Sequence, residues 1–166
     1  MVQYKAQRVG VFVDVQNMYY SAKNLFEAKV NFGKVLEEAV GARELIRAIA
    51  YTVKGPQSEE DNFFAALSKI GFEVKMRPLQ VFLGGAKKGD WDVGMCMDAI
   101  RMAGKLDVVV LVSGDGDFEP LVSYLKYSEG CVVEVMAFAK TTSSKLKEEA
   151  DAFTDLGESK KFLLRK

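Results

Sequence analysis

Acidic side chains follow two of the most apolar segments of the chain. Asp14 lies near the end of the run at residues 9–15, and Asp115 and Asp117 follow the run at residues 106–112. If these runs form neighbouring parallel strands, their carboxyl ends meet at one sheet edge, where open α/β folds bind ligands. Carboxylates crowded into a small volume repel one another and normally need a cation. Oxygen ligands without His or Cys favour Mg²⁺ or Mn²⁺.

Histidine is absent from the whole sequence. Its absence excludes Ser-His-Asp and Cys-His catalysis, imidazole metal ligands and acid–base chemistry based on histidine. Any hydrolytic chemistry therefore depends on carboxylates, together with a hard metal ion.

Each of these polar residues also has a purely structural interpretation. Asp117 and Asn17 are favoured N-cap residues for a following helix, and Asp115, between two glycines, fits a turn. Asp14 fits a polar strand end, or the phosphoacceptor of a receiver-type domain in which Lys140 follows a later strand. The receiver interpretation does not explain the two acids that follow the second apolar run.

A third acidic segment lies between these two, at residues 87–100 (KKGDWDVGMCMDAI). Asp92 stands where a helix begins and fits an N-cap. Asp98 has apolar neighbours, so it lies on a narrow solvent face or points into a polar site. The two are ~120° apart around a helix, so they share one site only if Asp92 lies on the entry turn. Lys87 and Lys88 form either a solvated loop or contacts for the phosphates of a polyanionic substrate.

Charge and aromatic content bear on nucleic-acid binding. Lysine plus arginine equal aspartate plus glutamate at 23 each, so the formal net charge is zero. Proteins that coat duplexes are usually more basic, so a nucleic acid would bind here at a local patch. Trp91, Tyr19 and Tyr20 offer ring faces for base stacking, although core packing is the commoner role for aromatic residues.

Strands alternate with helices along the chain, which predicts an α/β fold of three layers, α/β/α, with a largely parallel, Rossmann-like sheet. We expect one domain over residues 1–166 because no long linker interrupts the pattern. Apolar runs predict strands at 9–15, 44–53, 72–76, 106–112 and 131–137, and an extra strand or edge ribbon at 79–83. Helical spacing predicts helices at 17–28, 33–40, 92–103, 117–127 and 143–150. One more helix is expected to begin at Ser58, which resembles the first residue of a capping box, and to end at Gly71.

The cysteine content and the hydropathy of the sequence indicate the compartment in which we expect the protein. Cys96 and Cys131 lie in apolar contexts without CxxC spacing, which is typical of free thiols in a reducing cytosol. No apolar run approaches the ~20 residues of a membrane span, so we expect a cytoplasmic protein. Apolar helix faces are compatible with a homo-oligomer and equally with a core.

Four motifs occur in order: FVDVQN (12–17), KKGDWDVGMCMDAI (87–100), SGDGDF (113–118) and SSKLKEEADAFTDL (143–156). Together they resemble the NYN domain family, in particular its LabA-like branch, over nearly the whole chain. The resemblance implies a fold similar to that of PIN nucleases and a metal-dependent acidic centre that cuts RNA.

The resemblance assigns the catalytic metal centre to Asp14, Asp92, Asp115 and Asp117. Of the neighbouring acids Asp90 and Asp92, we choose Asp92 because the predicted helix begins there. The residues expected to bind substrate around this centre are Asn17, Lys88, Ser113 and Asp98.

The expected function is that of a metal-dependent ribonuclease, which uses Mg²⁺ or Mn²⁺ to hydrolyse RNA phosphodiester bonds. The alternative is an RNA-binding or regulatory NYN domain with little or no catalysis, acting through RNA or protein contacts. RNA binding that persists in EDTA without cleavage would favour the alternative.

Overall fold

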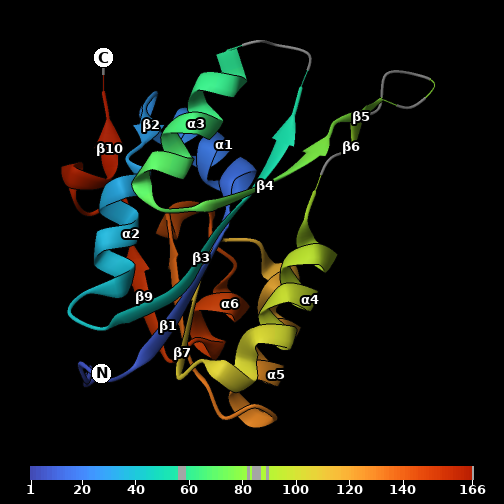
Figure 1. The fold of residues 1–166 in the computed structure, drawn as a ribbon. Coiled ribbons are helices and arrows are strands. Elements are labelled where there is room, and N and C mark those ends of the chain that lie inside the picture. The colour runs from blue at the N-terminus through green and yellow to red at the C-terminus, as the bar shows by residue number, and fades with distance from the viewer. Residues whose placement is uncertain (56–58, 82, 84–86, 89, 166) are drawn as a thin grey trace.

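A six-stranded sheet forms the centre of the computed structural model, which describes residues 1–55, 59–81, 83, 87–88 and 90–165 (Figure 1). Every neighbouring pair of strands in this sheet is parallel. The strand order is β4 (Glu73–Pro78), β3 (Glu44–Lys54), β1 (Arg8–Asp14), β7 (Val108–Val112), β8 (Val132–Ala137) and β9 (Ala152–Asp155). Two short antiparallel pairs lie outside it: β2 (Lys29–Val30) with β10 (Leu163–Leu164), and β5 (Gln80–Val81) with β6 (Lys87–Lys88).

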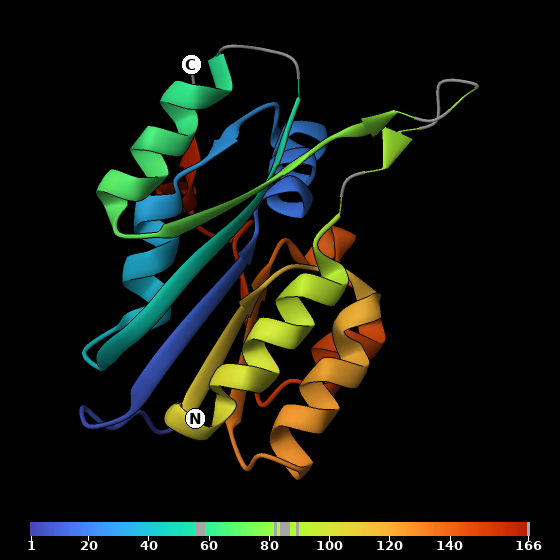
Figure 2. The same cartoon turned by 45° about the vertical axis from the view of Figure 1, so that its right-hand side comes forward.

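Helices cover both faces of the sheet (Figures 1 and 2). One face carries α1 (Val15–Phe26), α2 (Phe32–Val40) and α3 (Glu59–Ile70), and the other carries α4 (Asp92–Met102), α5 (Glu119–Tyr127) and α6 (Ser144–Glu149). The described residues also form four short 3₁₀ turns: η1 (Ala103–Lys105), η2 (Gly116–Phe118), η3 (Ala139–Thr141) and η4 (Lys160–Phe162).

The central strands are apolar throughout because both of their faces are buried. All five residues of β7 are buried, as expected for an inner strand of a parallel sheet. Alternate side chains enter opposite cores: Val11 and Val13 pack with α1, α2 and α3, whereas Phe12 packs with α4, α5 and α6. The predicted three-layer α/β/α fold is confirmed.

The chain moves outward from the centre of the sheet in both directions. β3 and β4 lie on one side of β1, whereas β7, β8 and β9 lie on the other. The connections that follow β1 and β7 therefore diverge, and such a switch point is where open α/β sheets bind ligands. Val13 pairs with Val112, so Asp14 and Ser113 leave the sheet at the same level.

The predicted alternation of elements is confirmed, and the observed ends differ from the predicted ones by about two residues or fewer. β9 and the β2–β10 pair were not predicted, and β6 lies where a loop was expected, because segments this short show no clear period. Ser58 of the predicted capping box lies outside the described residues. None of the helices in the described ranges is long and apolar enough to cross a membrane. Cys96 and Cys131 are free thiols, the first half-buried and the second buried.

Candidate metal centre

Polar side chains tie together the carboxyl ends of β1 and β7. Asp14 caps α1 because its Oδ1 accepts a hydrogen bond from the backbone N–H of Asn17 (3.2 Å). Its Oδ2 accepts one from the hydroxyl of Ser113 (3.2 Å), just beyond β7. The backbone N–H of Gly114 donates to Oδ1 of Asn17 (3.0 Å). The two strand ends therefore meet, as the sequence predicts.

The segment after β7 is held in a tight turn under the connection between β8 and α6. Asp115 caps η2 by accepting a hydrogen bond from the backbone N–H of Asp117 (2.9 Å). A Cβ added to Gly114 would lie 2.9 Å from Oγ1 of Thr142, and one added to Gly116 would lie 2.9 Å from Oγ of Ser143. Both glycines are therefore needed for close approach of the two loops.

An anchored tryptophan brings α4 to the same edge. Trp91 donates from Nε1 to the carbonyl oxygen of Thr52 (2.8 Å), and its ring centroid lies 5.5 Å from that of Tyr51. The guanidinium carbon of Arg77 lies 4.2 Å from the Trp91 ring centroid. Asp92 follows in the first turn of α4, so this packing fixes where its carboxylate lies.

Three carboxylates approach one another at this edge, and we call them the carboxylate trio. One oxygen each from Asp92, Asp115 and Asp117 lie within 4.8 Å of one another. None of the ion pairs in the described part of the chain includes a member of the trio. Three converging carboxylate oxygens are ligands of the kind that Mg²⁺ and Mn²⁺ prefer, so these residues fit a divalent ion.

Burial and mutual repulsion oppose ionisation of these acids. Burial, and after it the negative charges of neighbouring acids, Asp115 first, raise the pKa of Asp92 to about 7. Burial also raises the pKa of Asp14 to about 6, despite the hydrogen bonds that its carboxylate accepts. A cation held among the carboxylates would offset this repulsion.

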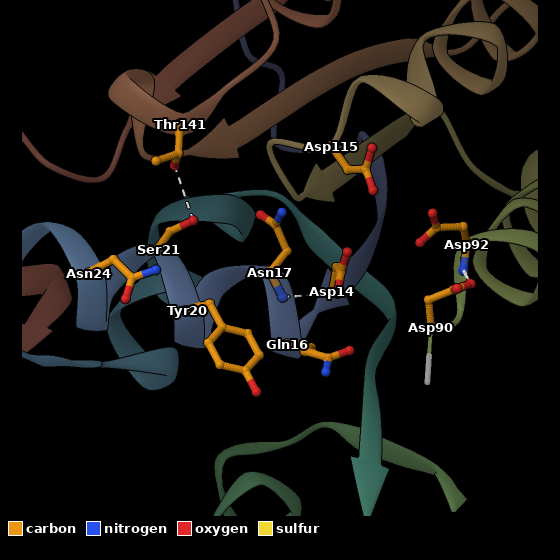
Figure 3. A pocket seen from close by; sticks show the side chains of 10 residues that line it. All are labelled: Asp14, Gln16, Asn17, Tyr20, Ser21, Asn24, Asp90, Asp92, Asp115 and Thr141. Carbon is orange, nitrogen blue, oxygen red and sulfur yellow. Dashed lines mark hydrogen bonds between the residues drawn. The ribbon is translucent and has the colours of Figure 1, made fainter. Parts of the chain in front are cut away.

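A cavity of about 270 Å³ opens beside the carboxylates (Figure 3). We call one part of its lining the acidic side and the rest the neutral side. The acidic side consists of Asp14, Asp90, Asp92 and Asp115, and the neutral side consists of Gln16, Asn17, Tyr20, Ser21, Asn24 and Thr141. Asp90 and Asp92 both line the cavity, but only Asp92 belongs to the trio.

Comparison with known proteins agrees with this architecture. The family model of the NYN domain matches residues 8–157. The chain belongs to the NYN domain family. This NYN domain is 25% identical to the Low amplitude and bright protein LabA of Synechococcus elongatus, over 96% of this chain and 89% of that protein. Its fold matches the solved structure of a protein of unknown function from Vibrio parahaemolyticus, with a TM-score of 0.89, 34% identity, and coverage of 99% of this chain and 100% of the other.

Asp98 of this NYN domain lies on α4 but does not line the cavity. The residue is 3% exposed, and its carboxylate accepts hydrogen bonds from Tyr51 Oη (2.7 Å), Lys75 Nζ (2.6 Å) and Arg101 Nη2. Burial alone would raise the pKa of Asp98, but these bonds outweigh it and hold the pKa below its ordinary value. The predicted substrate contact is therefore not supported, because Asp98 instead ties α4 to β3 and β4.

The other predicted substrate contacts of this NYN domain fall into two groups. Asn17 lines the cavity, and Ser113 is fully buried against Asp14, which it orients. Lys88 belongs to β6 by its backbone, and its side chain lies outside the described part of the structure. Its phosphate contact stays a prediction.

Several of the purely structural interpretations are wrong. Asp14 rather than Asn17 caps α1. The N-cap position of α5 is Phe118, without a side-chain hydrogen bond, so Asp117 does not cap that helix. The N-cap position of α4 is Trp91, without a side-chain hydrogen bond, so Asp92 does not cap that helix. The carboxylates of Asp92 and Asp117 are therefore not used by helix caps.

Sequence reasoning missed most of the neutral side. Ser21 and Asn24 follow Asn17 at a spacing of four and seven residues on α1, which places them on the same helix face. That spacing was visible in the sequence. Thr141 had no such signal, because its position depends on how the connection between β8 and α6 folds back over the end of β7.

Proposed function

We propose that this NYN domain is a metal-dependent ribonuclease, which hydrolyses RNA phosphodiester bonds with Mg²⁺ or Mn²⁺ held by Asp92, Asp115 and Asp117. The observation that carries the proposal is the carboxylate trio, whose oxygens lie within 4.8 Å of one another beside an open cavity. Membership of the NYN domain family, a PIN-like nuclease family, supports a nucleic acid as the substrate.

A divalent ion held by these carboxylates would polarise a phosphate and would lower the pKa of a bound water. The protein supplies the carboxylates that hold the ion and orient the reacting groups. Asp14 lines the same cavity as Asp92 and Asp115, and we propose that its carboxylate either completes the metal site or accepts the proton of the attacking water. With no histidine in the chain, carboxylates are the groups available for this proton transfer.

Ser113 has a positioning role in this proposal. Its hydroxyl donates to Asp14 and accepts a hydrogen bond from the backbone N–H of Asp115 (3.2 Å), while the residue is fully buried. One hydroxyl thus couples the acid that ends β1 to the acids that follow β7. Such supporting hydrogen bonds fix the direction of metal-ligating groups.

The test is Mn²⁺-dependent cleavage of a single-stranded RNA by the wild type and by Asp14→Asn and Asp115→Asn. We expect cleavage by the wild type, at least a hundredfold loss in each variant, and no loss in Asp61→Asn, which removes an exposed carboxylate on α3 that pairs with Lys54. Circular dichroism checks that every variant is folded. Undiminished cleavage in both site variants contradicts the proposal, and RNA binding in EDTA without cleavage in Mn²⁺ favours the regulatory alternative.

A further inference from the structure

The neutral side of the cavity is built mainly by one face of α1. Tyr20 and Asn24, four residues apart, are exposed, and Ser21 between them is 7% exposed. Oγ1 of Thr141 and Oγ of Ser21 are 3.0 Å apart in a hydrogen bond that joins α1 to η3. Figure 3 shows these side chains on one side of Asn17 and the acids on the other.

No positive charge lines the cavity among the described residues, since its lining consists of four aspartates and six neutral side chains. Among the described lining residues, none therefore offers a cationic contact to the phosphates of an RNA strand. The parts of a nucleotide that neutral side chains can contact instead of its phosphates are the base and the sugar. The whole cavity, with the acidic side included, has a volume of about 270 Å³, slightly below the ~300–1,000 Å³ of small-ligand pockets, so the neutral side has room for no more than one nucleoside.

Tyr20 is the aromatic residue that such a contact would use. Tyr20 is 51% exposed. Its ring makes an edge-on contact with the ring of Tyr19, and the two ring centroids are 5.3 Å apart. Trp91 is occupied by Tyr51 and Arg77. Stacking on a tyrosine tolerates any base, because every base has a π face.

The side-chain amides near Tyr20 can form hydrogen bonds with the edge of a base. Gln16 and Asn24 both line the cavity, and each carboxamide donates and accepts hydrogen bonds. They can therefore bind the polar edge of different bases without selecting one. A base within a duplex has its edge paired and its faces stacked, so this arrangement takes an unpaired nucleotide.

We propose that the neutral side is a subsite for one unpaired nucleoside, with its base stacked on Tyr20 next to the carboxylate trio. This inference deepens the proposed ribonuclease function and rests on it. Tyr20 is a binding residue in this account and takes no part in proton transfer.

The test compares an intact fluorescent hexaribonucleotide with a series of hexaribonucleotides, each of which lacks the base at one position. Binding is measured by anisotropy in Ca²⁺, an oxygen-preferring ion, and electrophoresis verifies that the probes stay intact. For the wild type, we expect one abasic position to weaken binding about tenfold, in line with the stacking of one base. Tyr20→Ala should lose the same tenfold on the intact probe and show no penalty at that position, whereas Tyr20→Phe should stay within twofold of the wild type.

Tyr127→Ala is the matched control, because Tyr127 is 74% exposed at the end of α5 and does not line the cavity. It should bind every probe as the wild type does. Equal binding of all probes by the wild type, or an unchanged abasic penalty in Tyr20→Ala, overturns the inference. Cleavage of the intact probe by the wild type in Mn²⁺ is scored separately, so a failed subsite with intact cleavage is distinguishable from a failed nuclease with an intact subsite.

Discussion

Asp92 and Asp98 lie on the same helix, six residues apart, yet their surroundings differ in kind. Asp98 is buried and receives hydrogen bonds from Tyr51, Lys75 and Arg101. Asp92 faces other carboxylates across the cavity and has no positive partner among the described ion pairs. The pKa of Asp98 is lowered and that of Asp92 is raised.

Asp98 is therefore an acid that stabilises the fold, whereas Asp92 is an acid that remains available to a ligand. A buried carboxylate that is fully hydrogen-bonded holds elements together, whereas uncompensated carboxylates that converge on a cavity cost stability until a cation binds. Apolar neighbours in the sequence singled out Asp98, but its partners in space decide its role.

Metal addition should produce the largest effect. Mn²⁺ at ~100 times its Kd should stabilise the folded wild type by about 2.7 kcal/mol, because it binds only the folded state. Thermal unfolding with and without Mn²⁺ measures the shift. Asp115→Asn should lose most of this stabilisation, whereas Asp98→Asn should retain it. An equal shift in all three proteins would show that Asp115 does not hold the ion.

Removal of Asp98, whose charge is compensated by its hydrogen-bond partners, should give the next largest effect on stability. Asp98→Ala leaves the Tyr51 hydroxyl and the Lys75 ammonium without their partner, and should lower the free energy of unfolding by about 2 kcal/mol, a value reduced for the exposure of Lys75 and Arg101. Urea unfolding measures the change. Asp92→Ala, the matched variant on the same helix, should cause no comparable loss in the metal-free protein.

The smallest effect is a pH-dependent gain in stability from Asp92→Asn. Because the folded-state pKa of Asp92, about 7, lies above its ordinary value of 3.8, folding favours the protonated form. Its contribution is fully present below about pH 4 and is lost as the pH rises through 7. At pH 8 without metal, Asp92→Asn should therefore be more stable than the wild type by about 1 kcal/mol, after discounting for the half-exposed position.

Urea unfolding at pH 4 and pH 8 checks this prediction. The difference between the two proteins should vanish at pH 4. A variant less stable than the wild type at pH 8 would show that the charge of Asp92 is compensated, as that of Asp98 is.

The sequence predicted the sheet and the approach of the two strand ends that carry Asp14 and Asp115, because buried parallel strands are apolar runs whose carboxyl ends lie at one edge. It did not predict the partners of Asp98, since Tyr51 and Lys75 come from β3 and β4 and meet α4 only through the strand register. Thr141 and β9 depend likewise on how the last third of the chain folds back. The local sequence pattern therefore located the acids, whereas tertiary packing determines which of their negative charges remain uncompensated.

The proposed nuclease depends on a hard cation held by Asp92, Asp115 and Asp117. This binding can be tested with crystals soaked in Mn²⁺ and measured at the manganese absorption edge. We expect an anomalous peak bounded by these three carboxylates, with Asp14 beside it, and no peak at Asp98. Crystals in which the three carboxylates stay as close as they are here but bind no Mn²⁺ would contradict it.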